Sequence, residues 1–222
     1  MSAHGWRTGL AGLALAALCA APALAASDAA VQAPTLRVDD TWVYRLTEDG
    51  QATPLMQRVT GVDADGYRLE SQEIDFGGFQ RTRLDRQLNL VEREVGAHRL
   101  VSFTPFYPYF QFPLEPGAEW SGEVQIRHNW EAGFLLDRSL RFRVVGWEEV
   151  HVPAGILHAL RIEGEGRNGG RIGERELHGR VHERLWYAPA VRNVVRREFD
   201  EPAATGGRHK QTWELLEYHL QP

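Results

Sequence analysis

Cysteine is almost absent from this chain: Cys19 is the only one in 222 residues. It lies in an N-terminal segment that we expect to be removed, so the mature chain, residues 26–222, can form no disulfide bond. Small exported domains commonly depend on disulfides for their stability. This domain must instead be stabilised by its hydrophobic core, and a chain of this length can bury roughly 70% of its unfolded surface.

The chain also lacks an excess of charge and, beyond its N-terminus, any long apolar run. Its 25 lysine and arginine residues against 30 aspartate and glutamate residues give a formal net charge of −5, and Lys210 is the only lysine. A mildly acidic chain is not attracted to nucleic acids or to anionic lipid surfaces. No later segment reaches the roughly 18 apolar residues that a membrane-spanning helix needs. We therefore expect no nucleic-acid partner and no integral membrane segment in the mature chain.

The first 25 residues have the pattern of a secretory signal peptide. A weakly basic start is followed by the apolar run Leu10–Leu18 and by a small-x-small sequence at residues 23–25, which predicts cleavage after Ala25. Cys19 would carry a lipid in a lipoprotein, but Leu18 precedes it where a small residue is required. We therefore expect an unlipidated protein that is periplasmic or secreted.

Hydrophobic alternation predicts β-strands throughout the mature chain. Trp42, Tyr44 and Leu46 share one face of a strand that ends at the turn Asp49-Gly50, and similar stretches recur towards the C-terminus. No segment has a convincing helical period. The sequence thus predicts an all-β fold: a strongly curved antiparallel sheet forming an open barrel or half-barrel, with few or no helices.

A faint internal repeat bears on the domain organisation. The spacing from Leu36 to Trp42 recurs from Leu114 to Trp120, and each tryptophan opens a predicted strand. Neither half has enough strands to cover its own sheet. We therefore expect a single β-rich domain over residues 26–222, with a possible organisation in two halves, 36–113 and 114–222.

Two strand–turn–strand units show their turn chemistry in the sequence. In the unit at residues 152–155, Val-Pro-Ala-Gly, proline presets φ and glycine accepts a left-handed conformation, which is typical of a type I hairpin turn with a glycine bulge. The second unit contains Trp-Tyr-Ala-Pro at residues 186–189. Together they resemble a TapB-like family of exported bacterial proteins of unknown function, whose members combine a VPAG hairpin with a WYAP-type turn. Because Ala190 and Arg192 stand where that family has glycines, we expect a type I turn at residues 188–191.

Three patterns that could carry chemistry fit ordinary structure better. Residues 164–169 match GxGxxG, but no helix is predicted after them, so we interpret them as a flexible hairpin loop rather than a phosphate site. His178 and His182 would lie about 13 Å apart on a strand, too far for one metal ion. No serine lies in a nucleophile elbow. We expect no catalytic residue, metal or cofactor, although carboxylates or histidines converging from different strands would indicate an exported hydrolase.

The segment Phe103–Pro113 is rich in aromatic residues and prolines. Proline cannot donate to a β-ladder, so this stretch cannot be an ordinary central strand. Exposed aromatic side chains indicate an apolar ligand, a membrane surface or a protein partner. The alternative is a plug that seals the core at one end of the sheet, with the hydroxyls of Tyr107 and Tyr109 in solvent. The candidate ligand-binding residues are five aromatics of this segment and one tryptophan: Phe106, Tyr107, Tyr109, Phe110, Phe112 and Trp130.

These observations predict a non-catalytic periplasmic β-domain that binds an apolar, lipid-like ligand or an envelope component near Phe106–Phe112. The alternative function is a structural or assembly factor of the cell envelope that binds a protein partner through an edge strand, for which Arg192–Phe199 is the candidate. A closed, filled interior with Phe106 and Phe110 both buried would contradict the first prediction. An exposed, uninterrupted edge strand at residues 192–199 would favour the second, whereas an edge protected by proline or by charge would count against it.

Overall fold

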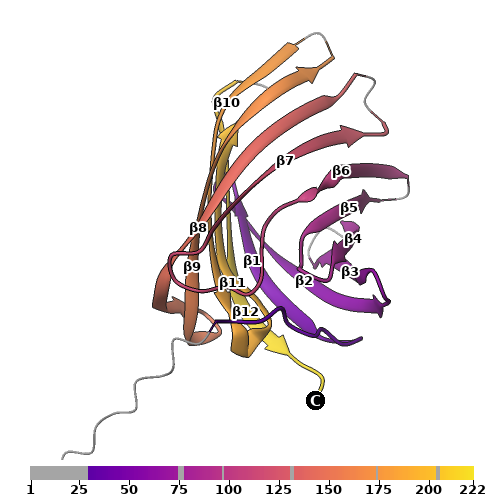
Figure 1. The fold of residues 1–222 in the computed structure, drawn as a ribbon. Coiled ribbons are helices and arrows are strands. Elements are labelled where there is room, and N and C mark those ends of the chain that lie inside the picture. The colour runs from indigo at the N-terminus through magenta and orange to yellow at the C-terminus, as the bar shows by residue number, and fades with distance from the viewer. Residues whose placement is uncertain (1–29, 75–77, 97, 131–132, 174, 204–205) are drawn as a thin grey trace, which may run out of the picture.

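A computed structural model describes residues 30–74, 78–96, 98–130, 133–173, 175–203 and 206–222. Within these residues, twelve β-strands follow one another in chain order around a closed antiparallel barrel (Figure 1). The predicted signal peptide lies outside the described residues. The strands are β1 Thr41–Glu48, β2 Gln51–Val62, β3 Gly66–Glu73, β4 Phe79–Asp85, β5 Leu90–Val95, β6 Arg99–Tyr107, β7 Glu119–His128, β8 Leu135–Val152, β9 Gly155–Ile172, β10 Arg175–Ala188, β11 Asn193–Pro202 and β12 Arg208–His219.

The barrel closes because the first and last strands pair with each other. On β1, Thr41 lies opposite His219 of β12 on one side and opposite Arg58 of β2 on the other. Closure gives each of these strands a partner on both sides, which removes the free edges of a curved sheet. The predicted all-β, strongly curved antiparallel fold is confirmed, although the barrel is closed where the sequence predicted an open one.

Side chains that alternate towards the inside of the barrel form its core. Ile162 of β9 lies between Val144 of β8 and Leu185 of β10, and all three are buried. Each large apolar side chain that is fully removed from water contributes about 1.5–3 kcal/mol. A short 3-10 helix, Pro189–Val191, interrupts the strands. In the part of the chain that is described, no helix is long and apolar enough to cross a membrane.

The three longest strands, β8, β9 and β10, rise together along one side of the barrel (Figure 1). β9 continues through residues 164–169, which pair with β8 on one side and β10 on the other. The predicted hairpin loop at this glycine-rich motif is therefore wrong. The glycines instead permit close approach: a Cβ on Gly166 would lie 2.3 Å from the carbonyl oxygen of Ser139, and one on Gly164 would lie 2.4 Å from the Phe142 ring.

Both turns that carry the family resemblance are formed. Val152 pairs with Gly155, whose φ is +125°, so the predicted hairpin is confirmed. The second turn forms the 3-10 helix and ends at Arg192, a non-glycine residue with a left-handed φ of 59°. Such a conformation costs about 1–2 kcal/mol. The Arg192 guanidinium lies 3.3 Å from a carboxylate oxygen of buried Asp40, an ion pair that compensates for this strain.

The predicted edge strand at Arg192–Phe199 is wrong, because β11 has a partner on both sides. Phe199 lies opposite Glu183 of β10 and opposite Gln211 of β12. The ladder is interrupted elsewhere, between β6 and β7, where the pairing among the described residues is limited to residues 101–104 with residues 125–128. Beyond this short pairing the two strands separate, and the aromatic segment lies at the gap.

Candidate functional site

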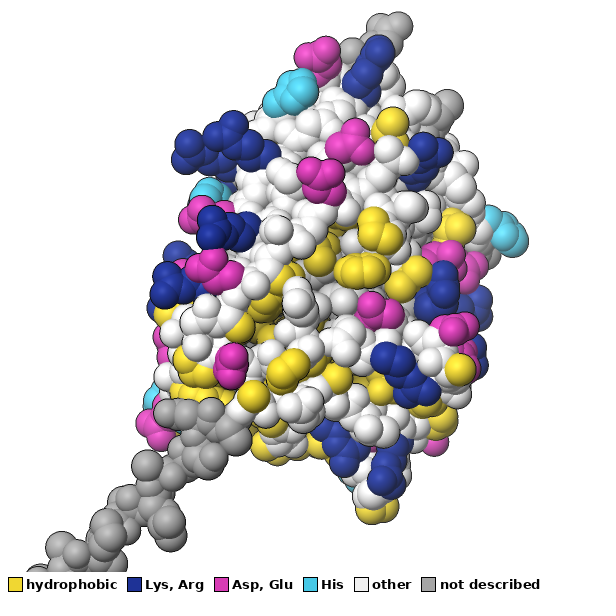
Figure 2. All heavy atoms as spheres, viewed as in Figure 1, with side chains coloured by type: hydrophobic (Ala, Val, Ile, Leu, Met, Phe, Trp, Pro, Cys, Tyr) yellow, Lys and Arg dark blue, Asp and Glu magenta, His cyan; other side chains and the backbone are white. Residues whose placement is uncertain are grey.

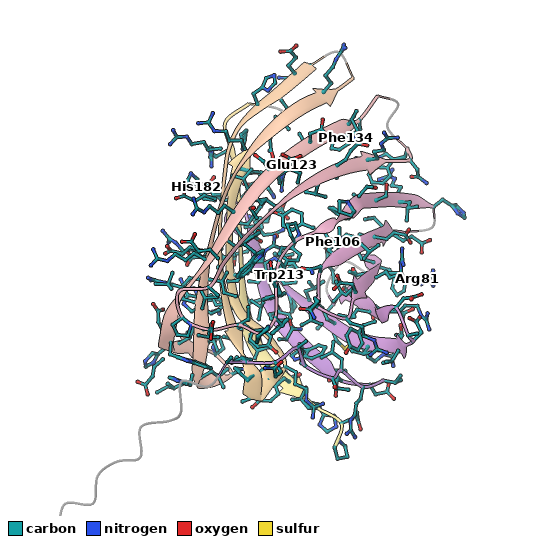
Figure 3. The ribbon with its side chains drawn as sticks, viewed as in Figure 1. Arg81, Phe106, Glu123, Phe134, His182 and Trp213 are labelled. Carbon is teal, nitrogen blue, oxygen red and sulfur yellow. The ribbon has the colours of Figure 1, made fainter. Side chains whose placement is uncertain are left out.

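A surface cleft of about 610 Å³ lies where β6 and β7 separate. Hydrophobic side chains gather in a hollow near the middle of the face shown in Figure 2, and Figure 3 labels Phe106 and Glu123 in this region. The apolar lining consists of Pro105, Phe106, Pro108, Phe110, Phe112 and Trp120. The polar lining consists of Asp85, Gln87, Asn89, Gln111, Ser121 and Glu123.

Three of the predicted site residues, Phe106, Phe110 and Phe112, meet in this cleft. Phe110 is only 6% exposed, and its ring stacks on that of Phe112 with centroids 5.5 Å apart. Phe106 and Phe112 are half-buried. The segment therefore seals the core with Phe110 while presenting part of two further rings at the surface, so it combines both predicted arrangements.

The turn between β4 and β5 holds the aromatic segment in place. The side chain of Asn89 accepts a hydrogen bond from the backbone N–H of Phe110, and that of Gln87 accepts one from the N–H of Phe112, both at 2.8 Å. Asp85 fixes the turn itself by accepting hydrogen bonds from the N–H groups of Gln87 and Asn89, also at 2.8 Å. These side chains replace the missing ladder partners of a proline-rich strand. The cleft wall is therefore pre-organised.

Tyr107 points into the barrel, so the prediction that its hydroxyl faces solvent is wrong. Its side chain is 2% exposed, and the hydroxyl donates a hydrogen bond of 3.1 Å to Glu183. Arg197 binds the other carboxylate oxygen of Glu183 at 2.6 Å. Burial, reinforced by the charge of Glu183, raises the pKa of Tyr107 well above its ordinary value. The ring of Tyr109, half-buried, lies 4.4 Å from that of Tyr107 and beneath the guanidinium of Arg197.

A second buried ion pair continues this network on the neighbouring strands. Arg138 of β8 donates to the hydroxyl of Tyr107 at 3.2 Å and to the side-chain oxygen of Asn168 at 2.7 Å. It also forms an ion pair with Glu201 of β11. Hydrogen bonds that connect buried charges in this way satisfy polar groups that would otherwise be costly inside a barrel. The network consequently fixes the relative positions of β6, β8, β9, β10 and β11.

A second cavity, of about 110 Å³, lies inside the barrel. It is lined mainly by aliphatic and aromatic side chains, and Phe110 separates it from the surface cleft because it lines both. Two arginines, Arg93 and Arg197, also line it. Arg197 is paired with Glu183, but Nε of Arg93 is buried and has no hydrogen-bond partner within the described ranges.

The remaining predicted ligand residue, Trp130, is not in the cleft. It lies beyond the end of β7, is 40% exposed and stacks on His128 at 4.3 Å. His178 and His182 lie on the exposed side of β10, and Figure 3 shows His182 at the outer surface. Among the residues whose positions are described, no three histidine, cysteine, aspartate or glutamate side chains converge into a metal-binding group.

Sequence reasoning missed the charged residues inside the barrel. Glu183 alternates with Val181 and Leu185 on the apolar face of β10, and Arg138 alternates with Leu136 and Leu140 on β8. A charged residue at an inward position of an alternating strand was therefore the available signal. Arg93 carries the same signal, because it alternates with Val91 and Val95 on β5 while Glu92 and Glu94 lie on the other face.

Comparison with solved structures identifies related folds at low sequence identity. A candidate exported protein with a YmcC-like fold from Bacteroides fragilis superposes with a TM-score of 0.53 and 16% identity, over 86% of this chain and all of the other. A candidate lipoprotein from Parabacteroides distasonis gives a TM-score of 0.51 and 12% identity, again over 86% of this chain and all of the other. No protein-family model and no curated protein matches this chain significantly. The fold is thus one that other proteins share, while the TapB-like resemblance stays a prediction.

Proposed function

We propose that this chain is a non-catalytic periplasmic binding protein that holds an apolar ligand in the cleft between β6 and β7. The observation that carries the proposal is the cleft of about 610 Å³ in which Phe106, Phe110 and Phe112 meet. Small-molecule sites typically measure about 300–1,000 Å³ and are lined mainly by apolar and aromatic side chains, with a few polar groups. This cleft has a volume within that range, and six apolar or aromatic side chains line it beside six polar ones.

The size of the two cavities favours the cleft over the barrel interior as the site for an apolar chain. The interior cavity measures about 110 Å³, well below the size that a lipid-like molecule needs. The core residues that fill the rest of the barrel would have to move to admit such a ligand. The surface cleft requires no such repacking.

Charge limits what the polar end of the ligand can be. Asp85 and Glu123 line the cleft, and none of its described lining residues is a lysine, arginine or histidine. An anionic head group would be repelled by these two carboxylates. The ligand that fits is therefore neutral or cationic at its polar end.

The predicted signal peptide at residues 1–25 supports an exported location. The similar folds described as a candidate exported protein and a candidate lipoprotein agree with it. In this chain we expect cleavage after Ala25, which removes Cys19 and leaves a protein that is periplasmic or secreted.

Binding of the neutral fluorophore N-phenyl-1-naphthylamine to purified residues 26–222 tests this proposal. We expect Phe106→Ser to weaken binding about five- to tenfold, because it removes part of a buried aromatic surface. Phe79→Ser is the matched control, since Phe79 of β4 is also half-buried but contacts Arg81 outside the cleft. Equal affinity of the two variants would contradict the proposed site.

A second candidate function follows from the β7 edge inside the cleft. Residues 119–124 pair with β8 but have no ladder partner on the β6 side within the described ladders. An extended segment of an envelope protein could add to such an edge. Native mass spectrometry of protein purified from a periplasm distinguishes the two. A small apolar adduct supports ligand binding, whereas a co-purifying protein that protects the amides of residues 119–124 from hydrogen exchange supports the assembly function.

A further inference from the structure

The cavity inside the barrel is lined by an arginine, Arg93, that forms no ion pair with any described carboxylate. Arg93 lies on β5 opposite Thr82 of β4 and Val101 of β6, and its side chain lines the cavity together with Tyr109 and Arg197. Its Nε atom is buried without a hydrogen-bond partner, and no described carboxylate forms an ion pair with its guanidinium. Buried polar groups in proteins are normally paired, so the half-buried guanidinium of Arg93 has an unfilled hydrogen-bonding position at Nε.

The neighbouring charges do not supply that partner. Glu183 is engaged by Arg197, and Glu201 is engaged by Arg138. Burial lowers the pKa of Arg93 and the positive charge of Arg197 lowers it further, while Tyr109 acts in the opposite direction. Among the described residues, the inward arginines Arg93, Arg138 and Arg197 thus face the carboxylates of Glu183 and Glu201, and Arg93 is left without one.

We propose that this cavity binds the carboxylate of a small organic acid, with Arg93 as its counter-ion. A guanidinium binds a carboxylate through two parallel hydrogen bonds, which is the strongest pairing available to it. The side chains of Tyr109 and Thr82 also line the cavity, and their hydroxyls can donate further hydrogen bonds to the carboxylate oxygens. This site is separate from the surface cleft, whose acidic lining favours the opposite charge.

The cavity also limits the size and charge of the acid. An apolar cavity of about 150 Å³ accommodates benzene, so a cavity of about 110 Å³ admits a carboxylate with a short alkyl chain. Leu36, Leu69, Leu90 and Leu185 supply apolar contacts for that chain. A single uncompensated positive charge matches a monoanion, which favours a carboxylate over a doubly charged phosphate. Gln57, Thr82 and Arg93 are only half-buried although they line the cavity, so a ligand can enter past them.

The test compares the affinities of three ligands of similar length for three forms of the protein. Butanoate, 1-butanol and butylamine are titrated into residues 26–222, into Arg93→Met and into Arg93→Lys, by calorimetry and by amide shifts of β5. Hydrogen bonds to a charged group contribute about 1.5–3 kcal/mol, so we expect Arg93→Met to weaken butanoate binding at least tenfold. Arg93→Lys retains the charge and should keep most of the affinity, and 1-butanol should bind all three forms alike.

Two readouts separate a ligand site from a purely structural arginine. Arg93→Met removes an uncompensated charge, so its melting temperature without ligand should equal or exceed that of the parent protein, whereas loss of a structural contact would lower it. Equal binding of butanoate and 1-butanol by the parent protein, no binding of butanoate, or unchanged binding by Arg93→Met would each overturn the proposal. Phe106→Ser should leave butanoate binding unchanged, so failure at the cleft is distinguishable from failure here.

Discussion

Replacing Glu183 tests whether the buried charge network holds the barrel together. This carboxylate has no exposed side-chain surface and binds Arg197 at 2.6 Å, and Arg197 is itself only 15% exposed. Glu183→Ala would leave the guanidinium of Arg197 and the hydroxyl of Tyr107 without their shared acceptor. Breaking a buried ion pair from one side costs about 3–5 kcal/mol, because the remaining charge stays in a poorly solvated position.

That loss is a large fraction of the stability of an ordinary domain, which is about 5–15 kcal/mol. For a domain of this size it corresponds to a fall in melting temperature of roughly 6–20 °C. Glu183→Gln keeps an acceptor in place but removes the charge, so we expect a smaller loss of about 1–2 kcal/mol. Urea unfolding followed by circular dichroism gives these values from the shift in midpoint, provided that the slope is unchanged.

The matched control is Glu198→Ala on the adjacent strand β11. Glu198 binds Arg184 and Arg196 on the outer side of the barrel, and such surface pairs contribute about 0–1 kcal/mol. The double variant Glu183→Leu/Arg197→Leu removes both charges and should be more stable than Glu183→Ala alone. If Glu183→Ala is no more destabilising than Glu198→Ala, the argument that Glu183 is the essential partner of Arg197 is refuted.

Two further predictions concern backbone packing and pH. Gly166→Ala should lower the free energy of unfolding by about 1–3 kcal/mol, because the added methyl group overpacks against Ser139. Gly169→Ala on the same strand is the control and should change this free energy by less than about 0.5 kcal/mol, because the nearest atom to its Cβ is 3.9 Å away. Similar urea midpoints for the two variants would contradict the close approach of β8 and β9. Burial raises the pKa of Tyr44, Tyr107 and Tyr187 in the folded protein. The folded state therefore keeps its full stability below a pH of about 10, where tyrosine is neutral in the unfolded chain as well. Above that pH the free energy of unfolding should fall by about 1.4 kcal/mol per pH unit for each tyrosine. Tyrosinate absorbance that rises only together with unfolding would agree with this, and ionisation of all three in the folded state would not.

The sequence was sufficient to predict the strands because period-two alternation survives along most of the chain. Trp42, Tyr44 and Leu46 share the buried face of β1 as predicted. The VPAG turn connects β8 and β9. Closure of the barrel could not be predicted, since it depends on the pairing of β1 with β12, two segments at opposite ends of the domain. The same limit applied to β11, whose second partner is β12.

Two segments depart from their predicted arrangement for physical reasons. Residues 164–169 are predicted as a hairpin loop because clustered glycines are typical of turns and loops, but here the glycines admit neighbouring strands that a Cβ would exclude. Tyr107 was expected in solvent because a tyrosine usually presents its hydroxyl to water. The acceptor that keeps it inside, Glu183, lies 76 residues away, and only the fold brings the two together.

The charged residues that line the surface cleft and the interior cavity differ in sign, so the two cavities favour ligands of opposite charge. Phe110 forms part of both, with Asp85 and Glu123 on the cleft side and Arg93 and Arg197 on the barrel side. An apolar core of equal volume would stabilise a barrel at least as well as buried ion pairs do, so stability alone does not account for an additional arginine without a carboxylate. A barrel that carried one lipid-like acid would place its basic residue at the cleft, where the apolar volume is. The two proposed sites would therefore take ligands of different charge, because the larger apolar volume lies beside Asp85 and Glu123 while the guanidinium of Arg93 lines the smaller cavity.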